Sequence, residues 1–175
     1  MSWIFAYGSL MWDFDLASEE RVEGVLDGYH RSFNKKSTRN WGTSGMPGPV
    51  LGLEPGGECR GIVFRIADDG WDEVVSEIDD REGPSYDAQD ESVQLTDGRT
   101  VTARVWVNDR ERFTYIGDRS VEERARMAVN ASGTNGSAQE YVLETWRELQ
   151  ALGIEDPHIE AFVQQVRTIA DEPPT

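Results

Sequence analysis

The chain is short of the residues that build metal sites and covalent cross-links. Its one cysteine, Cys59, excludes an intrachain disulfide framework and a cysteine-rich zinc site. His30 and His158 are its only histidines, so a histidine-based metal centre is not expected either. We therefore predict no metal site. At 175 residues the chain is long enough to bury a substantial core without cross-links.

Long apolar runs and basic residues are also scarce. No apolar run approaches the roughly 20 residues that cross a bilayer, and no basic-then-apolar leader is visible, so we expect a soluble, cytoplasmic protein. Lys and Arg number 17 against 33 Asp and Glu, a net charge of −16, which argues against binding to nucleic acid phosphates. The acids are spread along the whole chain. We therefore interpret the acidic composition as an adaptation to a high-salt cytoplasm, whose ions screen the repulsion between the carboxylates. An ordinary acidic surface is the plainer alternative.

The order of the hydrophobic patterns predicts an α+β fold, because strands come first and helices last. Alternating or apolar runs predict strands at residues 3–7, 22–34, 60–66, 91–95 and 101–107, the last two joined by an Asp-Gly turn. Helical spacing and capping residues predict helices at residues 70–80, 120–130, 139–152 and from 156 onward. We predict one domain over residues 1–170 and a short polar tail at 171–175. The glycine-rich stretch Lys35–Pro49 is too long for a simple connection and is interpreted as functional or mobile.

The sequence contains neither the nucleotide-binding glycine motifs nor the Gly-x-Ser-x-Gly elbow. Two other features suggest catalytic chemistry. The first strand ends at Tyr7-Gly8-Ser9-Leu10, where a glycine lets backbone N–H groups approach a carboxylate or an oxyanion. Glu82 follows a predicted helix and precedes a Gly-Pro turn that would hold it in place. An ordinary turn and a helix-end surface acid are the plainer alternatives.

Six segments in order resemble the ChaC-like γ-glutamylcyclotransferases of the glutathione-specific type. They occupy residues 3–12, 28–33, 46–50, 59–64, 80–82 and 132–141, so that the resemblance covers nearly the whole chain. It implies a γ-glutamylcyclotransferase-like α+β fold, a small mixed β-barrel-like sheet with packed helices and a helical C-terminal half. It also implies an enzyme that cleaves glutathione or a close relative into 5-oxoproline and a free amine such as Cys-Gly, without a metal or organic cofactor.

The resemblance also implies roles for individual residues. Glu82 is the expected catalytic residue, a proton shuttle between the substrate's α-amine and the leaving amine. The expected substrate-binding residues are Tyr7, Gly8, Ser9, Leu10, Tyr86 and Tyr141. For the last two tyrosines, packing alone is an equal alternative. The expected partner is a small γ-glutamyl molecule, with no nucleic acid and no membrane, and a monomer is favoured.

Departures from the family pattern leave other functions open. Ala6 replaces the common glycine before Tyr7, and Tyr86 follows Glu82 without the usual paired glycines. The alternatives are a cyclotransferase acting on γ-glutamylcysteine or another γ-glutamyl amine, and a non-catalytic small-ligand module of the same fold. An acidic scaffold for basic proteins explains the charge but not the ordered motifs.

Overall fold

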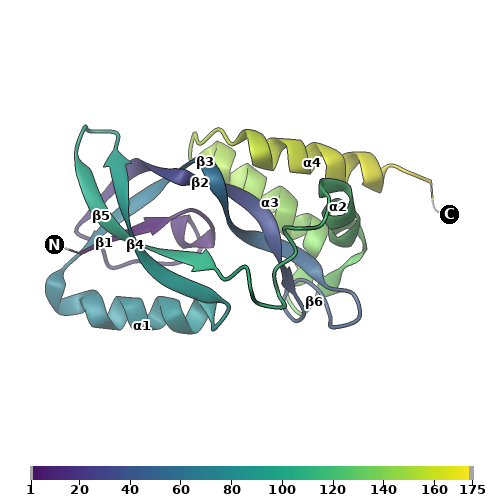
Figure 1. Ribbon diagram of the computed structural model, residues 1–175, viewed down its shortest axis with the longest axis horizontal. Helices are drawn as coiled ribbons and strands as arrows, with labels where there is room; N and C mark the ends of the chain where they lie inside the picture. The colour runs from purple at the N-terminus through teal and green to yellow at the C-terminus, as the bar shows by residue number, and fades with distance from the viewer. Residues whose placement is uncertain (1, 174–175) are drawn as a thin grey trace. The chain divides into compact units, whose positions relative to one another are not determined.

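The computed structural model describes residues 2–173 (Figure 1). The chain divides into two compact units, the first made of Met1–His30 and Pro55–Asp109, the second of Arg31–Glu54 and Arg110–Thr175. Each unit is assembled from two segments that are far apart in the sequence. The single domain expected over residues 1–170 stays a prediction, and residues 174–175 of the expected tail lie outside the described part.

The sheet is a closed barrel of mixed strand directions. Its strands are β1 (Ser2–Ala6), β2 (Glu20–Ser37), β3 (Gly48–Ile66), β4 (Tyr86–Leu95) and β5 (Thr100–Asn108), in the order β1-β3-β2-β4-β5. β1 is antiparallel to β3 and parallel to β5. Because β1 has a neighbour on both sides, it has no edge, and its continuous apolar run is buried. The mixed, barrel-like sheet is thus confirmed.

The predicted hairpin is also present. β4 ends at Leu95 and β5 begins at Thr100, which leaves Thr96–Arg99 in the turn. Gly98 adopts a φ of 93° there, a left-handed conformation that side chains other than glycine rarely take. The Asp-Gly pair was therefore a sound signal for the position of this turn.

One helix, α1 (Trp71–Glu82), follows the short 3-10 helix η2 (Asp68–Gly70) in the first unit. Figure 1 shows it below the strands of that unit, with Val74 and Ile78 on its buried face. It ends at Glu82 because Gly83 turns the backbone to a φ of 74° and donates its N–H to the Asp79 carbonyl. The helix runs two residues further than the predicted end at Asp80, and Glu82 is its last residue.

The second unit is mainly helical. It holds α2 (Val121–Asn130), a small hairpin of β6 (Ser132–Gly133) and β7 (Gly136–Ser137), α3 (Ala138–Ala151) and α4 (Pro157–Ala170). The expected caps are both confirmed: Ser120 and Glu123 form a capping box, and Asp156 accepts bonds from the first turn of α4. The apolar face of α4 is buried, and Phe162 on that face stacks on Phe33 with 4.8 Å between ring centroids.

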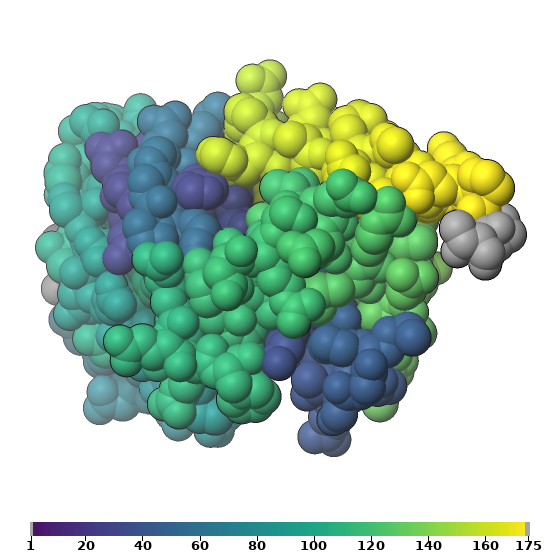
Figure 2. Space-filling view, turned by 45° about the vertical axis from the view of Figure 1, so that its right-hand side comes forward, coloured from purple at the N-terminus to yellow at the C-terminus, as the bar shows by residue number. Residues whose placement is uncertain are grey.

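Part of the stretch Lys35–Pro49 belongs to strands, so the loop is shorter than we predicted. β2 continues to Ser37 and β3 begins at Gly48. Only residues 38–47 connect the two strands. The base of this loop is fixed, since the N–H groups of Thr134 and Asn135 donate to carbonyls of residues 39 and 40. Its tip protrudes as the dark-blue lobe at the lower right of Figure 2. The glycine-containing segment at residues 132–137 forms the β6–β7 hairpin.

Candidate active site

The segment Tyr7–Leu10, here called the YGSL loop, leaves β1 and enters the 3-10 helix η1 (Ser9–Met11) in a tight turn. The Ser9 carbonyl accepts bonds from the N–H groups of Trp12 at 3.1 Å and Asp13 at 2.7 Å, and Leu10 is buried. The leading N–H groups of a helix have no partner within that helix, so the amides of Ser9 and Leu10 have no acceptor inside η1. Backbone donors of this kind hold carboxylates and oxyanions in other proteins.

Tyr7 is fixed by a chain of hydrogen bonds that the sequence did not reveal. Its hydroxyl donates to the carbonyl of Trp106 on β5 at 2.7 Å. The indole N–H of Trp106 in turn donates to an Asp79 carboxylate oxygen on α1 at 2.7 Å. A buried indole N–H needs an acceptor, so a tryptophan in a valine-rich strand indicates that some link exists. The signal is weak, because it does not say which residue accepts the bond. This chain joins the end of β1, strand β5 and helix α1.

Arg81 makes a second connection between α1 and the YGSL loop. Its Nη2 donates to Ser9 Oγ at 3.1 Å and to Asp13 Oδ2 at 3.0 Å, and its Nη1 donates to the Asp13 carbonyl at 3.3 Å. The guanidinium carbon also lies 5.4 Å from the centre of the Phe14 ring. Because Glu82 is the next residue along α1, the helix end that carries Glu82 also holds Ser9.

Glu82 is half-buried, and Tyr86 begins β4 shortly after it. Tyr86 lines a cavity of about 520 Å³ whose other lining residues are Asp79, Asp80, Gly83, Pro84, Asp87 and Ala88. With three aspartates and no basic residue in this lining, the cavity is acidic. Apart from Tyr141, every residue of the predicted site belongs to the first unit.

Tyr141 belongs to the second unit, on α3. Its hydroxyl accepts the N–H of Leu51 at 3.1 Å. Its ring lies 5.0 Å from the ring of Trp41 and meets Phe33 edge-on at 6.0 Å. These contacts account for Tyr141 as a packed residue with a bonded hydroxyl, and its role in substrate binding stays a prediction.

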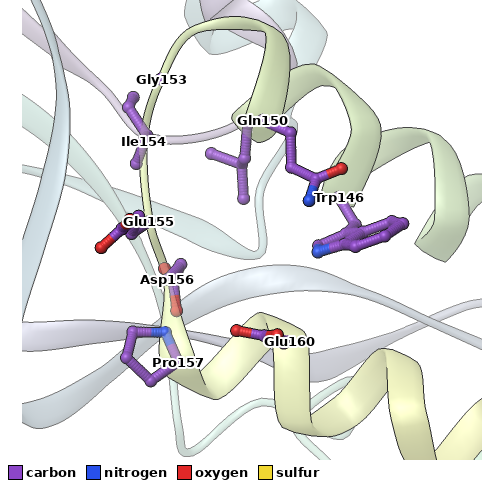
Figure 3. A pocket seen from close by; sticks show the side chains of 9 residues that line it. Trp146, Gln150, Gly153, Ile154, Glu155, Asp156, Pro157 and Glu160 are labelled. Atoms are coloured by element: carbon purple, nitrogen blue, oxygen red, sulfur yellow. The ribbon is translucent and has the colours of Figure 1, made fainter.

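Another cavity, of about 550 Å³, lies in the second unit (Figure 3). Trp146 and Gln150 of α3 and Glu160 of α4 face it, but no residue of the predicted site does. Within residues 2–173 no helix is long and apolar enough to cross a membrane. In the same part of the chain, no three His, Cys, Asp or Glu side chains are grouped so that they could hold a metal ion.

Comparison with known proteins identifies the family. A model of the family described as ChaC-like protein matches residues 2–169. The chain belongs to the ChaC-like family. A relative from Escherichia coli (strain K12), the glutathione-specific gamma-glutamylcyclotransferase, is 32% identical over 97% of this chain and 74% of its own length. The Arabidopsis thaliana gamma-glutamylcyclotransferase 2-3 is 29% identical over 97% of this chain and 90% of its own.

The ChaC-like fold is shown by a solved structure as well. The crystal structure of a yeast gamma-glutamyl cyclotransferase specific to glutathione superimposes with a TM-score of 0.88 over 97% of both chains, at 19% identity. The resemblance drawn from six short motifs is therefore confirmed for both the family and the fold.

Proposed function

We propose that this ChaC-like protein is a γ-glutamylcyclotransferase that converts glutathione into 5-oxoproline and Cys-Gly. One observation supports this most directly: the last turn of α1 carries Glu82 and, through Arg81, holds Ser9 of the YGSL loop. A carboxylate and a set of backbone donors are thus joined in one small region of the first unit. Names of relatives in bacteria and animals agree with the choice of glutathione.

The reaction requires little beyond positioning and proton transfer. The α-amine of the glutamyl group attacks its own γ-carbonyl carbon, a C–N bond closes the five-membered ring, and the amide bond to Cys-Gly breaks. Holding the reacting groups in place supplies about 7–11 kcal/mol in comparable intramolecular reactions. A free α-amine has a pKa of about 8, so most of it is protonated at neutral pH and needs a base.

Glu82 serves as this base. Its carboxylate takes one proton from the α-ammonium and delivers it to the nitrogen of the departing amine as the C–N bond breaks. It then carries the second proton from the ring nitrogen to the freed amine, so two protons are transferred and the carboxylate is regenerated. The N–H groups of the YGSL loop hold the γ-glutamyl carboxylate or the tetrahedral oxyanion, and such a donor contributes about 3–4 kcal/mol in enzymes where it has been removed. We assign Tyr86 to a hydrogen bond with the glutamyl end of the substrate.

The test is release of 5-oxoproline by the wild type, Glu82→Gln and Glu77→Gln. Glu77 is the matched control, because it is an exposed glutamate on the same helix. We expect Glu82→Gln to lose about 10²- to 10⁴-fold in turnover, while Glu77→Gln keeps it. Activity of Glu82→Gln within about tenfold of the wild type, or about 1.4 kcal/mol of barrier, would show that another group carries the proton.

The substrate and the working salt concentration are tested in the same assay. Glutathione and γ-glutamylcysteine are compared at low and at molar KCl. We propose that the protein acts as a monomer in a high-salt cytoplasm, because its net charge is −16 and Lys35 and Lys36 are its only lysines. Preference for γ-glutamylcysteine would replace glutathione in the proposal. Ligand binding without 5-oxoproline release would instead favour a binding module.

A further inference from the structure

The bond between Arg81 and Ser9 fixes which way the Ser9 hydroxyl points its proton. A guanidinium has five N–H donors and no acceptor, so Ser9 Oγ is the acceptor in this bond. A hydroxyl that accepts from one side keeps its own proton for another partner. Ser9 is therefore prepared to donate a hydrogen bond, the role that an anionic group of the substrate requires.

Arg81 also holds both ends of the turn at residues 9–13, which begins within the YGSL loop. Ser9 lies at the start of η1, and Asp13 lies just beyond its end. The guanidinium reaches a side-chain oxygen of each residue and the Asp13 carbonyl, while the Asp13 N–H bonds back to the Ser9 carbonyl. This planar, forked geometry is specific to arginine, because lysine offers a single charged point.

We propose that Arg81 is a positioning residue of the cyclotransferase reaction. It sets the Ser9 hydroxyl as a donor toward the γ-glutamyl group and keeps the YGSL loop in register with Glu82, the residue next to it. This inference rests on the proposed function and adds a residue to it that lay outside the predicted site. Arg81 acts through Ser9 and the loop, with no contact to the reacting atoms required.

Arg104 provides a closely matched control within the first unit. Its side chain is 30% exposed and that of Arg81 is 32%. Arg104 bonds to Asp90 through two nitrogens and lies 5.5 Å from the centre of the Trp71 ring, as Arg81 lies over Phe14. Replacing Arg104 by methionine thus removes one ion pair and one cation–π contact without touching the YGSL loop.

The kinetic test is a double-mutant cycle measured as kcat/KM for glutathione. We expect Arg81→Met and Ser9→Ala each to lose about tenfold to hundredfold, as expected for an oriented donor to an anionic group. The double variant should fall within about threefold of Arg81→Met, because the two residues act as one unit. Arg81→Lys should have a higher kcat/KM than Arg81→Met but a lower one than the wild type. Arg104→Met should stay within about twofold of the wild-type kcat/KM.

A second readout does not depend on turnover. Hydrogen exchange at the amides of Trp12 and Asp13 reports whether the turn stays closed, since both bond to the Ser9 carbonyl. Arg81→Met should accelerate this exchange and Arg104→Met should leave it unchanged. A wild type that releases no 5-oxoproline, with faster exchange in Arg81→Met, would refute the proposed function and leave the loop-holding role intact.

The positioning role would be overturned by any of three results. The first is wild-type kcat/KM in Arg81→Met. The second is losses in Arg81→Met and Ser9→Ala that simply multiply in the double variant. The third is exchange in the turn that does not change in Arg81→Met. If Arg81→Met does not fold, the same comparisons with Arg81→Lys decide the question.

Discussion

Removing one partner of the buried ion pair between Arg31 and Asp156 should cost more stability than breaking an exposed ion pair. Arg31 Nη1 lies 3.1 Å from Asp156 Oδ2, and their side chains are 0% and 8% exposed. The other oxygen of Asp156 accepts the N–H groups of His158 and Ile159, so the same carboxylate caps α4. Replacing Asp156 therefore removes a buried charge partner and, with alanine, a helix cap as well.

The two contributions can be separated by two variants. Asp156→Asn keeps an oxygen for the cap but faces Arg31 with a neutral amide, and loss of one partner from a buried ion pair costs about 3–5 kcal/mol. Asp156→Ala also removes the cap, which adds about 1 kcal/mol. Both losses are large beside the roughly 5–15 kcal/mol that holds a typical domain folded.

Equilibrium unfolding in urea, followed by circular dichroism at low and at molar KCl, measures these free energies. The control is Glu122→Gln, which breaks the pair with Arg126, whose side chains are 59% and 47% exposed. We expect the control to cost less than about 0.5 kcal/mol. Added salt should shrink the effect of the control but not that of Asp156→Asn, since buried charges are screened less. A cost below about 1 kcal/mol for Asp156→Asn would refute the assignment of a strong buried pair.

Three further outcomes are expected. Ser9→Pro, which deletes a backbone N–H of the YGSL loop, should lower kcat/KM by at least about tenfold more than Ser9→Ala. Equal effects of the two changes would show that only the Ser9 hydroxyl contributes to the reaction. Gly48→Ala should lower the free energy of unfolding in urea by about 1–3 kcal/mol, because a Cβ there would lie 2.1 Å from a backbone oxygen. An unchanged unfolding midpoint would contradict this close packing. Hydrogen bonds from Arg99 lower the pKa values of Glu20 and Asp97, so these carboxylates stabilise the fold above their unfolded pKa values and lose that effect as the pH falls through the lowered ones. Arg99→Met should thus be less stable than the wild type at pH 7, and this difference should shrink as the pH falls below the unfolded pKa values of about 4. A difference that does not change with pH would contradict this.

Local signals in the sequence predicted the parts of the fold that local physics determines. Ser120 and Asp156 marked true helix starts because a cap needs only its own first turn. The start of β3 at Gly48 was missed, because the prolines and glycines between Gly48 and Gly57 are poor strand residues on propensity alone. Pairing with neighbouring strands in the barrel outweighs that propensity.

The candidate site divides in the same way. Glu82 and the YGSL loop could be singled out as candidates because each stands at an element end in a recognisable motif. The bond from Arg81 to Ser9 spans 72 residues of sequence, so no local rule could indicate it. The same holds for Tyr7 and Trp106, which are 99 residues apart. Contacts at this range follow only from the strand order of the barrel.

The position of β1 between β3 and β5 has a consequence for how the protein folds during synthesis. β1 spans Ser2–Ala6, yet its partners are residues 62–66 of β3 and residues 103–104 of β5. The chain loses conformational entropy when such long loops close, and it does so before the stabilising contacts between the strands form. Strands that pair over this sequence distance therefore assemble slowly. A nascent chain that has not yet reached β5 carries the YGSL motif but lacks the strand that holds Tyr7. Catalytic competence should therefore appear late on the ribosome, only once the barrel has closed around its earliest strand.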